Sequence, residues 1–274
     1  MTYQRQTLRK PALFEGLGLH SGIPVKVTVN PGNSGIRFRY GSQIWAATPE
    51  NVTDTTRCTR LGEISTVEHL MSALGGLEIT DVEIEVSEPE LPAMDGSSKP
   101  FLDGLVEAGF EAIGEADAPR PFSRIFVQDG EAKIAVSAGE GRWRYDYLTG
   151  DRWPGTQILE VPDVVAEYES VALARTFGLE EELPYIKAAG LAKGLDENSA
   201  LILGKEGYLN QARCEDEPVR HKILDAIGDI YLAGIPIRFL NVVAIRTGHT
   251  ATVKAAALLK EQISVLRVMM LHER

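Results

Sequence analysis

Three residues that could take part in metal or acid–base chemistry are spaced four apart in one stretch of the sequence: His221, Asp225 and Asp229. Residues four apart lie on the same face of an α-helix, so a histidine and an aspartate one turn apart can bind the same metal ion. The alternative is that this stripe is only the solvated face of an amphipathic helix. Spacing alone leaves both interpretations open.

The residues around this stripe predict a single helix from Asp216 to Gly234. Asp216 or Glu217 would cap it, Pro218 suits its first position, and Gly234 followed by Pro236 would end it. The side of the helix that would face the core is apolar: Ile223, Leu224, Ile227, Ile230 and Tyr231.

The sequence holds 5 histidines, so a second histidine ligand must come from a distant part of the chain. His69 stands near the start of a helix predicted over 65–76, directly after Glu68. His69, His221 and Asp225 with one water would form a catalytic zinc site that keeps an open position, with Glu68 as the neighbouring general base. Alternatively, Ser65-x-x-Glu68 is a capping box in which Glu68 only reaches back to the Ser65 N–H.

Two further histidines could lie in a pocket. His249 follows a predicted strand and precedes a helix, so it would be on a loop that either faces a crevice or is solvated. Asp229 would be beyond reach of the metal and could orient His249 and keep it protonated. His20 is in the glycine-rich bend 16–22, and although it is most simply a turn residue, glycines on both sides would let a ligand approach closely.

The composition is that of a soluble globular protein. With 274 residues, 44% of them hydrophobic, the chain is long enough for two domains of ordinary size. It has no apolar run of membrane-spanning length and no apolar segment behind its first five residues, so we expect a cytoplasmic protein. A net charge of −11 argues against nucleic-acid binding, and Cys58 and Cys214 are expected to be free thiols.

Periodicity predicts alternating strands and helices along the chain. In the first half, successive antiparallel strands are expected at 25–29 and 36–40, a strand at 82–86, and helices at 65–76 and from 101 to about 110. In the second half, strands are expected near 124–128, 131–137, 142–148, 156–161, 201–203 and 240–245. Helices are expected from Ala174 to about Ala189, over 218–233, and from about Thr250.

The second half repeats the order of elements of the first. His69-x-x-x-Ala73-Leu74-x-Gly76 also lines up with His221-x-x-x-Asp225-Ala226-x-Gly228. We therefore predict an α+β fold of two similar two-layer sandwich domains, packed face to face with the active site between them. The domains would span 1–115 and 123–274, joined by the acidic Ala/Pro-rich linker 112–122.

Several motifs together resemble those of the UDP-3-O-acyl-N-acetylglucosamine deacetylases. They are Gly18-Leu19-His20-Ser21-Gly22, Thr66-Val67-Glu68-His69-Leu70, Met94-Asp95-Gly96-Ser97, Ala174-Arg175-Thr176-Phe177-Gly178, Glu217-x-Val219-Arg220-His221-Lys222-x-x-Asp225-x-x-Gly228-Asp229 and Gly248-His249. The resemblance runs from about Gly16 to His249.

This resemblance implies a zinc-dependent hydrolase that removes the N-acetyl group from a UDP-3-O-acyl-N-acetylglucosamine, the committed step of lipid A synthesis in the Gram-negative cytoplasm. The family's zinc ligands fall on His69, His221 and Asp225, and Fe(II) or Co(II) could substitute. The resemblance further implies that Glu68 is the general base and that His249 is the general acid, with Asp229 as its partner. Thr176 would donate a hydrogen bond to the oxyanion, and Phe177 and Lys222 would contact the substrate.

The sequence departs from the family at Leu195, where a second glycine is common, and at Cys214, which is usually aromatic. The predicted helix 179–189 and the loop 190–198 would form the wall of an apolar channel for the acyl chain. Two rival functions stay open: a zinc deacetylase of another acylated amino-sugar, and a non-catalytic protein that binds sugar nucleotides.

Overall fold

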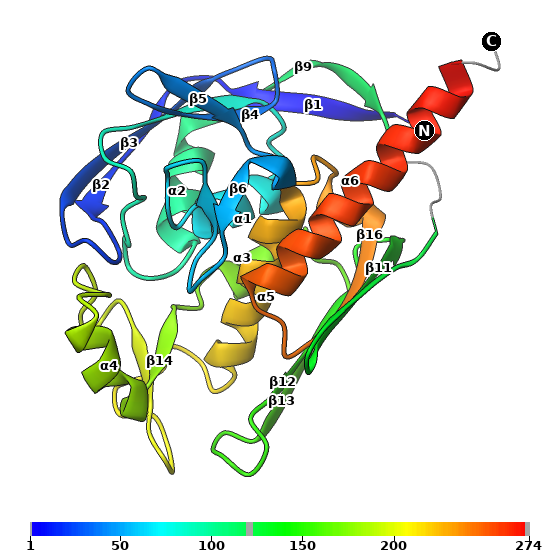
Figure 1. The fold of residues 1–274 in the computed structure, drawn as a ribbon. Coiled ribbons are helices and arrows are strands. Elements are labelled where there is room, and N and C mark those ends of the chain that lie inside the picture. Colours follow the sequence, from blue (N-terminus) through cyan, green and yellow to red (C-terminus); the bar gives the residue numbers. More distant parts are fainter. Residues whose placement is uncertain (1, 119–122, 272–274) are drawn as a thin grey trace.

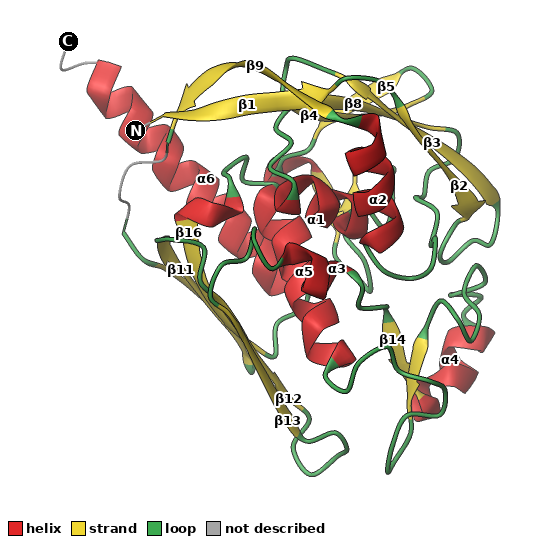
Figure 2. Cartoon of the chain, turned by 180° about the vertical axis from the view of Figure 1, so that it is seen from behind, coloured by secondary structure: helices red, strands yellow, loops and turns green. Residues whose placement is uncertain are grey.

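The computed structural model describes residues 2–118 and 123–271, with side chains described as far as residue 264. Its two largest sheets have five strands each, and helices fill the space between them (Figure 1). Figure 2 shows the same layering from behind. One set of buried apolar side chains runs through both halves, so the halves share a core. This architecture confirms the predicted α+β fold.

The sheet of the first half has the order β2-β3-β8-β4-β5. Its strands are β2 (Ala12–Leu17), β3 (Pro24–Pro31), β4 (Ile36–Tyr40), β5 (Gln43–Ala46) and β8 (Val82–Val86). β8 pairs antiparallel with β3 and parallel with β4. The strands predicted at 25–29 and 36–40 are therefore successive in the chain but separated by β8 in the sheet.

The sheet of the second half has the corresponding order β10-β11-β16-β12-β13. Its strands are β10 (Ile125–Asp129), β11 (Ala132–Ala138), β12 (Trp143–Leu148), β13 (Thr156–Val161) and β16 (Leu240–Ile245). β16 pairs antiparallel with β11 and parallel with β12, as β8 does with β3 and β4. The internal repeat inferred from the sequence is therefore confirmed in the connectivity of the two sheets.

Two helices of each half correspond in chain order. α1 (Glu68–Gly76) and α2 (Lys99–Ala108) accompany the first sheet, and α3 (Tyr168–Ala172), α5 (Glu217–Tyr231) and α6 (His249–Leu271) accompany the second. α1 and α5 come before the central strand of their sheet, and α2 and α6 come after it. α1 packs on α5, and all nine residues of α1 are buried, including the polar residues Glu68, His69 and Ser72.

The smaller elements extend these two layers. β1 (Thr2–Leu8) pairs with β9 (Phe110–Asp117), β6 (Val52–Asp54) with β7 (Arg60–Leu61), and β14 (Phe177–Leu179) with β15 (Leu201–Leu203). The short helix α4 (Leu183–Ala188) and the 3-10 turns η1 (Pro49–Asn51), η2 (Glu180–Glu182) and η3 (Ile237–Phe239) complete the fold.

Two predicted segments differ from the structure. The linker predicted over 112–122 was wrong for 112–117, because these residues belong to β9 and their backbone pairs antiparallel with β1; residues 119–122 lie outside the described chain. The helix predicted from Ala174 was also wrong, since β14 and η2 precede α4. Pro184 lies in the first turn of α4, and because proline is tolerated there but not in a helix interior, the helix begins late.

The central helix of the prediction is confirmed as α5, which begins at Glu217, one residue before Pro218. Asp216 occupies the N-cap position, as one of the two predicted candidates, but its side chain makes no capping hydrogen bond. A Cβ added to Gly228, in the middle of the helix, would lie 2.1 Å from the backbone oxygen of Glu68. This glycine therefore lets α5 cross the first turn of α1 closely, which brings His69 near His221.

Among residues 2–118 and 123–271, no helix combines the length and apolar character needed to cross a bilayer. Cys58 is buried and Cys214 is half-buried, and both are free thiols as predicted. Burial raises the pKa of Cys58 to about 12 and that of Cys214 to about 11, so both thiols stay protonated at neutral pH.

Candidate metal and active site

The structure brings His69, His221 and Asp225 together where α1 meets α5. One potential ligand atom from each lies within 4.8 Å of the other two, and all three residues are buried. Asp225 Oδ1 lies 3.3 Å from His221 Nε2 and 3.7 Å from His69 Nε2. Two imidazole nitrogens and one carboxylate oxygen are a donor set that suits zinc, so these residues fit the predicted ion.

The ligand stripe on α5 is not a solvated face, because His221, Asp225 and Asp229 are 3%, 7% and 1% exposed. The Ala174 carbonyl accepts a hydrogen bond from His221 Nδ1 over 3.0 Å, which leaves Nε2 free toward the cluster. Burial lowers the pKa of His221 to about 4, so this imidazole is neutral. Lys222 Nζ donates to Asp225 Oδ2 over 2.9 Å, while Asp225 Oδ1 faces the histidines.

Glu68 faces the same cluster from the first residue of α1. The capping box was wrong, because no side chain caps α1 and Glu68 Oε2 instead accepts a hydrogen bond from the Thr59 N–H over 2.9 Å. Its other oxygen, Oε1, lies 4.0 Å from His249 Nε2. Burial raises the pKa of Glu68, while the charges of His249 and His69 oppose that shift.

His249 and Asp229 form a hydrogen-bonded pair beside Glu68. His249 Nδ1 lies 2.9 Å from Asp229 Oδ2. Burial by itself would lower the pKa of His249, but the charge of Asp229 and this hydrogen bond raise it to about 9. His249 is the first residue of α6, so its predicted placement on a loop was wrong. Its side chain is only 10% exposed, so the alternative of a solvated histidine was also wrong.

Two threonines that sequence reasoning missed hold Asp229 in place. Thr59 Oγ1 donates to Asp229 Oδ1 over 2.5 Å, and Thr252 Oγ1 donates to Asp229 Oδ2 over 2.6 Å. Thr59 therefore contacts both carboxylates, Glu68 through its backbone and Asp229 through its hydroxyl. The proximity of Thr252 to His249 in the sequence was a usable signal, whereas Thr59 comes from a loop that no motif connects to the site.

A cavity of about 1020 Å³ opens from this cluster. His20, Thr176, Phe177 and Lys222 all line it, so the structure places every predicted substrate contact on one cavity. Lys222 Nζ lies 5.5 Å from the centre of the Phe177 ring, within reach of a cation–π interaction. The His20 backbone N–H donates to Glu90 Oε1 over 2.7 Å, which fixes the bend 16–22 at the cavity wall.

Another part of the cavity lining comes from α4, the chain from α4 to β15, β15 itself, and Arg57 in the loop between β6 and β7. Apolar lining residues here are Leu183, Ile186, Leu191, Leu195, Ala200 and Ile202, and cationic ones are Arg57, Lys187 and Lys193. Arg57 was missed by the sequence analysis. Leu195 lines the cavity, whereas Cys214 is not among the described residues that do so. A mixed apolar and cationic wall suits a ligand with both a hydrocarbon part and an anionic part.

Comparison with known proteins agrees with this geometry. The model of the family UDP-3-O-acyl N-acetylglycosamine deacetylase (LpxC) matches residues 5–261. A UDP-3-O-acyl-N-acetylglucosamine deacetylase of Cellvibrio japonicus is 37% identical over 283 residues, which cover 94% of this chain and 91% of the relative. The enzyme of the same name from Phenylobacterium zucineum is 36% identical over 275 residues, 92% of this chain and 93% of the relative. The chain therefore belongs to the UDP-3-O-acyl N-acetylglycosamine deacetylase family.

Proposed function

We propose that this protein hydrolyses the N-acetyl group of a UDP-3-O-acyl-N-acetylglucosamine, giving the free amine and acetate, as the committed step of lipid A synthesis in the cytoplasm. The observation that carries the proposal is one buried cluster at the end of a large cavity, in which a possible metal site adjoins Glu68 and the His249–Asp229 pair. Amide hydrolysis needs an activated water, a base and an acid, and this cluster offers a group for each.

The metal in this proposal is zinc, held by His69, His221 and Asp225. When bound there, it supplies Lewis-acid chemistry, polarising the acetyl carbonyl and making water easier to deprotonate. Fe(II) or Co(II) fit the same donors with altered affinity. Asp225 is held by Lys222 through one oxygen, which directs the other toward the two histidines.

The protein's own groups move the protons. Glu68, ionised, takes a proton from the attacking water, and its position next to His69 in α1 directs it to that water. His249, protonated, gives a proton to the departing sugar amine, and Asp229 keeps the imidazolium form available near neutral pH because it raises the pKa of His249 to about 9. Thr176 donates a hydrogen bond to the oxyanion formed from the acetyl carbonyl.

Substrate binding follows from the lining of the cavity. Lys222, Phe177 and His20 contact the sugar nucleotide, and the α4 region with the loop 190–198 receives the acyl chain. A buried methylene contributes about 0.8 kcal/mol, so a long chain gains much of its affinity in this channel. We also propose that the two halves of the repeat are two domains, which span residues 1–115 and 123–274.

The test is mass spectrometry of the products formed from a panel of UDP-3-O-acyl-N-acetylglucosamines of different chain length, with non-acylated UDP-N-acetylglucosamine as the control. The expected result is loss of one acetyl group, with a KM that rises steeply as the chain is shortened. Equal efficiency on the non-acylated control would favour a deacetylase of another amino-sugar. Binding without turnover by the metal-loaded protein would favour a non-catalytic protein.

A further inference from the structure

A buried ion pair lies beside the cluster and is not used by the proposed chemistry. The side chains of Arg175 and Glu217 are 4% and 0% exposed. Arg175 Nε donates to Glu217 Oε1 over 2.9 Å and Nη2 donates to Oε2 over 3.2 Å, which is a two-pronged arrangement. Because an apolar pair of similar volume often stabilises a core equally well, stability alone does not require charges at these two positions.

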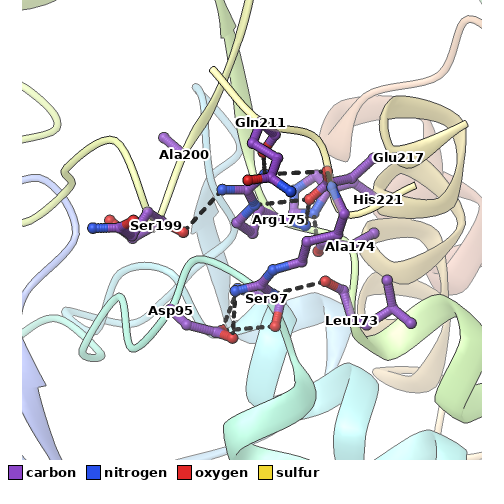
Figure 3. A network of polar contacts seen from close by, with 12 residues as sticks. Asp95, Ser97, Leu173, Ala174, Arg175, Ser199, Ala200, Gln211, Glu217 and His221 are labelled. Carbon is purple, nitrogen blue, oxygen red and sulfur yellow. Dashed lines mark hydrogen bonds and ion pairs between the residues drawn. The ribbon is translucent and has the colours of Figure 1, made fainter. Parts of the chain in front are cut away.

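The remaining bonds of the pair tie three separate segments together (Figure 3). Arg175 Nη1 donates to the Asn198 carbonyl over 3.0 Å, and Nη2 donates to the Gln211 carbonyl over 2.7 Å. Glu217 Oε2 accepts a further hydrogen bond from the Arg213 N–H over 2.7 Å. The pair therefore fixes both flanks of the β15 region against the first turn of α5.

The two sequence neighbours of Arg175 both reach the site. The Ala174 carbonyl bonds to His221 Nδ1, and Thr176 lines the cavity. The backbone N–H of Arg175 itself donates to Glu217 Oε1 over 3.0 Å. Since Glu217 is one turn before His221 in α5, the peptide at 174–176 and the ligand-bearing turn of the helix are held at a fixed separation.

We propose that Arg175 and Glu217 are positioning residues that hold the Ala174 carbonyl against His221, so that Nε2 of this histidine is presented to the metal, and that place Thr176 at the cavity wall. The catalytic part of this inference rests on the proposed function, whereas the metal-binding part does not. The flat guanidinium fork is required because it bonds Glu217, Asn198 and Gln211 at once, which a lysine ammonium on a flexible stem does not reproduce.

The experiment compares three proteins with the wild type: the double variant Arg175→Met/Glu217→Leu, the single variant Arg175→Lys, and the control Asp216→Asn/Arg220→Gln. The control removes the other ion pair at the start of α5, in which Arg220 Nε donates to Asp216 Oδ1 over 2.7 Å outside the cavity lining. Each protein is assayed for thermal unfolding, for zinc affinity by competition with a chromophoric chelator, and for kcat and KM separately. Imidazole-tuned ¹H–¹⁵N spectra report the tautomer of His221.

For the double variant we expect zinc affinity to fall about 10- to 100-fold, the range found when groups that orient metal ligands are removed. The Nδ1–H signature of His221 should weaken, and kcat should fall more than KM rises. The control should stay within about twofold of wild type in zinc affinity. A folded double variant with wild-type zinc affinity and an unchanged His221 signal would overturn the proposal.

If the double variant does not fold, Arg175→Lys decides the question. This variant keeps the positive charge next to Glu217 but loses the fork, and we expect weakened zinc binding with a changed His221 signal. Wild-type values for both would refute the inference. Zinc competition and the spectra need no substrate, so a chain that binds zinc but hydrolyses no acyl sugar nucleotide disproves the proposed function while the positioning role of the pair is still tested.

Discussion

α1 and α5 occupy equivalent places in the two halves of the repeat, yet they contribute differently to the site. Each carries a histidine of the cluster: His69 is the second residue of α1, His221 is the fifth residue of α5, and the two align in the sequence repeat. One turn later, Ala73 stands in α1 where Asp225 stands in α5. The repeat thus accounts for the pair of histidines, and a single divergent position supplies the third potential ligand.

The residues next to these histidines diverge as well. Glu68 precedes His69 and faces the cluster, whereas Arg220 precedes His221 and pairs with Asp216 away from it. Two turns after the histidines, Leu77 in the first half corresponds to Asp229 in the second. The first half therefore supplies a base candidate, and the second supplies a second ligand and the partner of His249. This division shows how a symmetrical scaffold can hold an asymmetric set of candidate catalytic groups.

The largest effect is expected when Asp225 of α5 is replaced by alanine, the residue that stands at the corresponding position 73 of α1. Asp225→Ala should abolish most zinc binding and lower kcat/KM by about a thousandfold or more, because a catalytic metal contributes several kcal/mol and each 1.36 kcal/mol is tenfold. Elemental analysis of the purified variant measures its zinc content, and steady-state kinetics measure its kcat/KM. Asp103→Ala, at an exposed carboxylate on α2, is the control; full zinc content in Asp225→Ala would remove Asp225 from the ligand set.

The second-largest effect on kcat is expected from substitutions of the residue that precedes each histidine, Glu68 in α1 and Arg220 in α5. Glu68→Gln should lower kcat by about 10²- to 10⁴-fold, since the amide cannot accept the proton, while zinc content stays near one per chain. Arg220→Gln, at the equivalent position of α5, should keep both zinc and kcat close to wild type. If both substitutions lower kcat equally, the proposed difference in role between Glu68 of α1 and Arg220 of α5 is refuted.

A smaller effect is expected at Asp229, the counterpart of Leu77. The charge of Asp229 raises the pKa of His249 to about 9 against the effect of burial, so activity that needs the imidazolium falls as the pH rises through that value. Asp229→Asn removes the raising charge, and the alkaline limb of kcat/KM should move down by about one pH unit or more. His249→Gln should flatten this limb. If the limb is unchanged in both variants, the proton donor is Glu68, or the limb belongs to another ionisation.

The smallest effect is expected from Thr59→Val, which keeps the backbone bond to Glu68 and removes the hydroxyl bond to Asp229. With one donor fewer, the Asp229 carboxylate interacts more strongly with His249. The alkaline limb should then move up by about half a pH unit or less, opposite to the shift in Asp229→Asn. Thr53→Val, at an exposed residue of β6, should leave the profile unchanged. A downward shift in Thr59→Val would mean that the hydroxyl does not moderate this carboxylate.

The sequence predicted those parts of the site that depend on local spacing. His221, Asp225 and Asp229 share one face because α5 is regular, and the repeat located His69 on the equivalent helix. The substrate came from the resemblance of the motifs and not from the residues alone. Thr59 escaped prediction because its contacts are set by tertiary packing, and one of them is made by its backbone.

The elements that were predicted wrongly share a physical cause. Helical spacing from Ala174 onward was overridden by parallel pairing of β14 with β15, and the acidic segment 112–117 became a strand because β1 offers it a partner. Both pairings join residues that are far apart in the sequence. The capping box at Glu68 failed for a related reason, because the buried carboxylate accepts a hydrogen bond from Thr59 instead of from its own helix.

The hydrogen bond from His221 to the Ala174 carbonyl also bears on competition between protons and metal. Burial lowers the pKa of His221 to about 4, and the Nδ1–H group donates a hydrogen bond to the carbonyl, so the lone pair of Nε2 is free at neutral pH. A metal ion that bound to His221 would therefore displace no proton from it. An imidazole with an ordinary pKa near 6.5 is largely protonated at about pH 5 and then competes with the ion. His221 stays mainly neutral down to about pH 5, so over that range protons compete little with a metal ion for its Nε2.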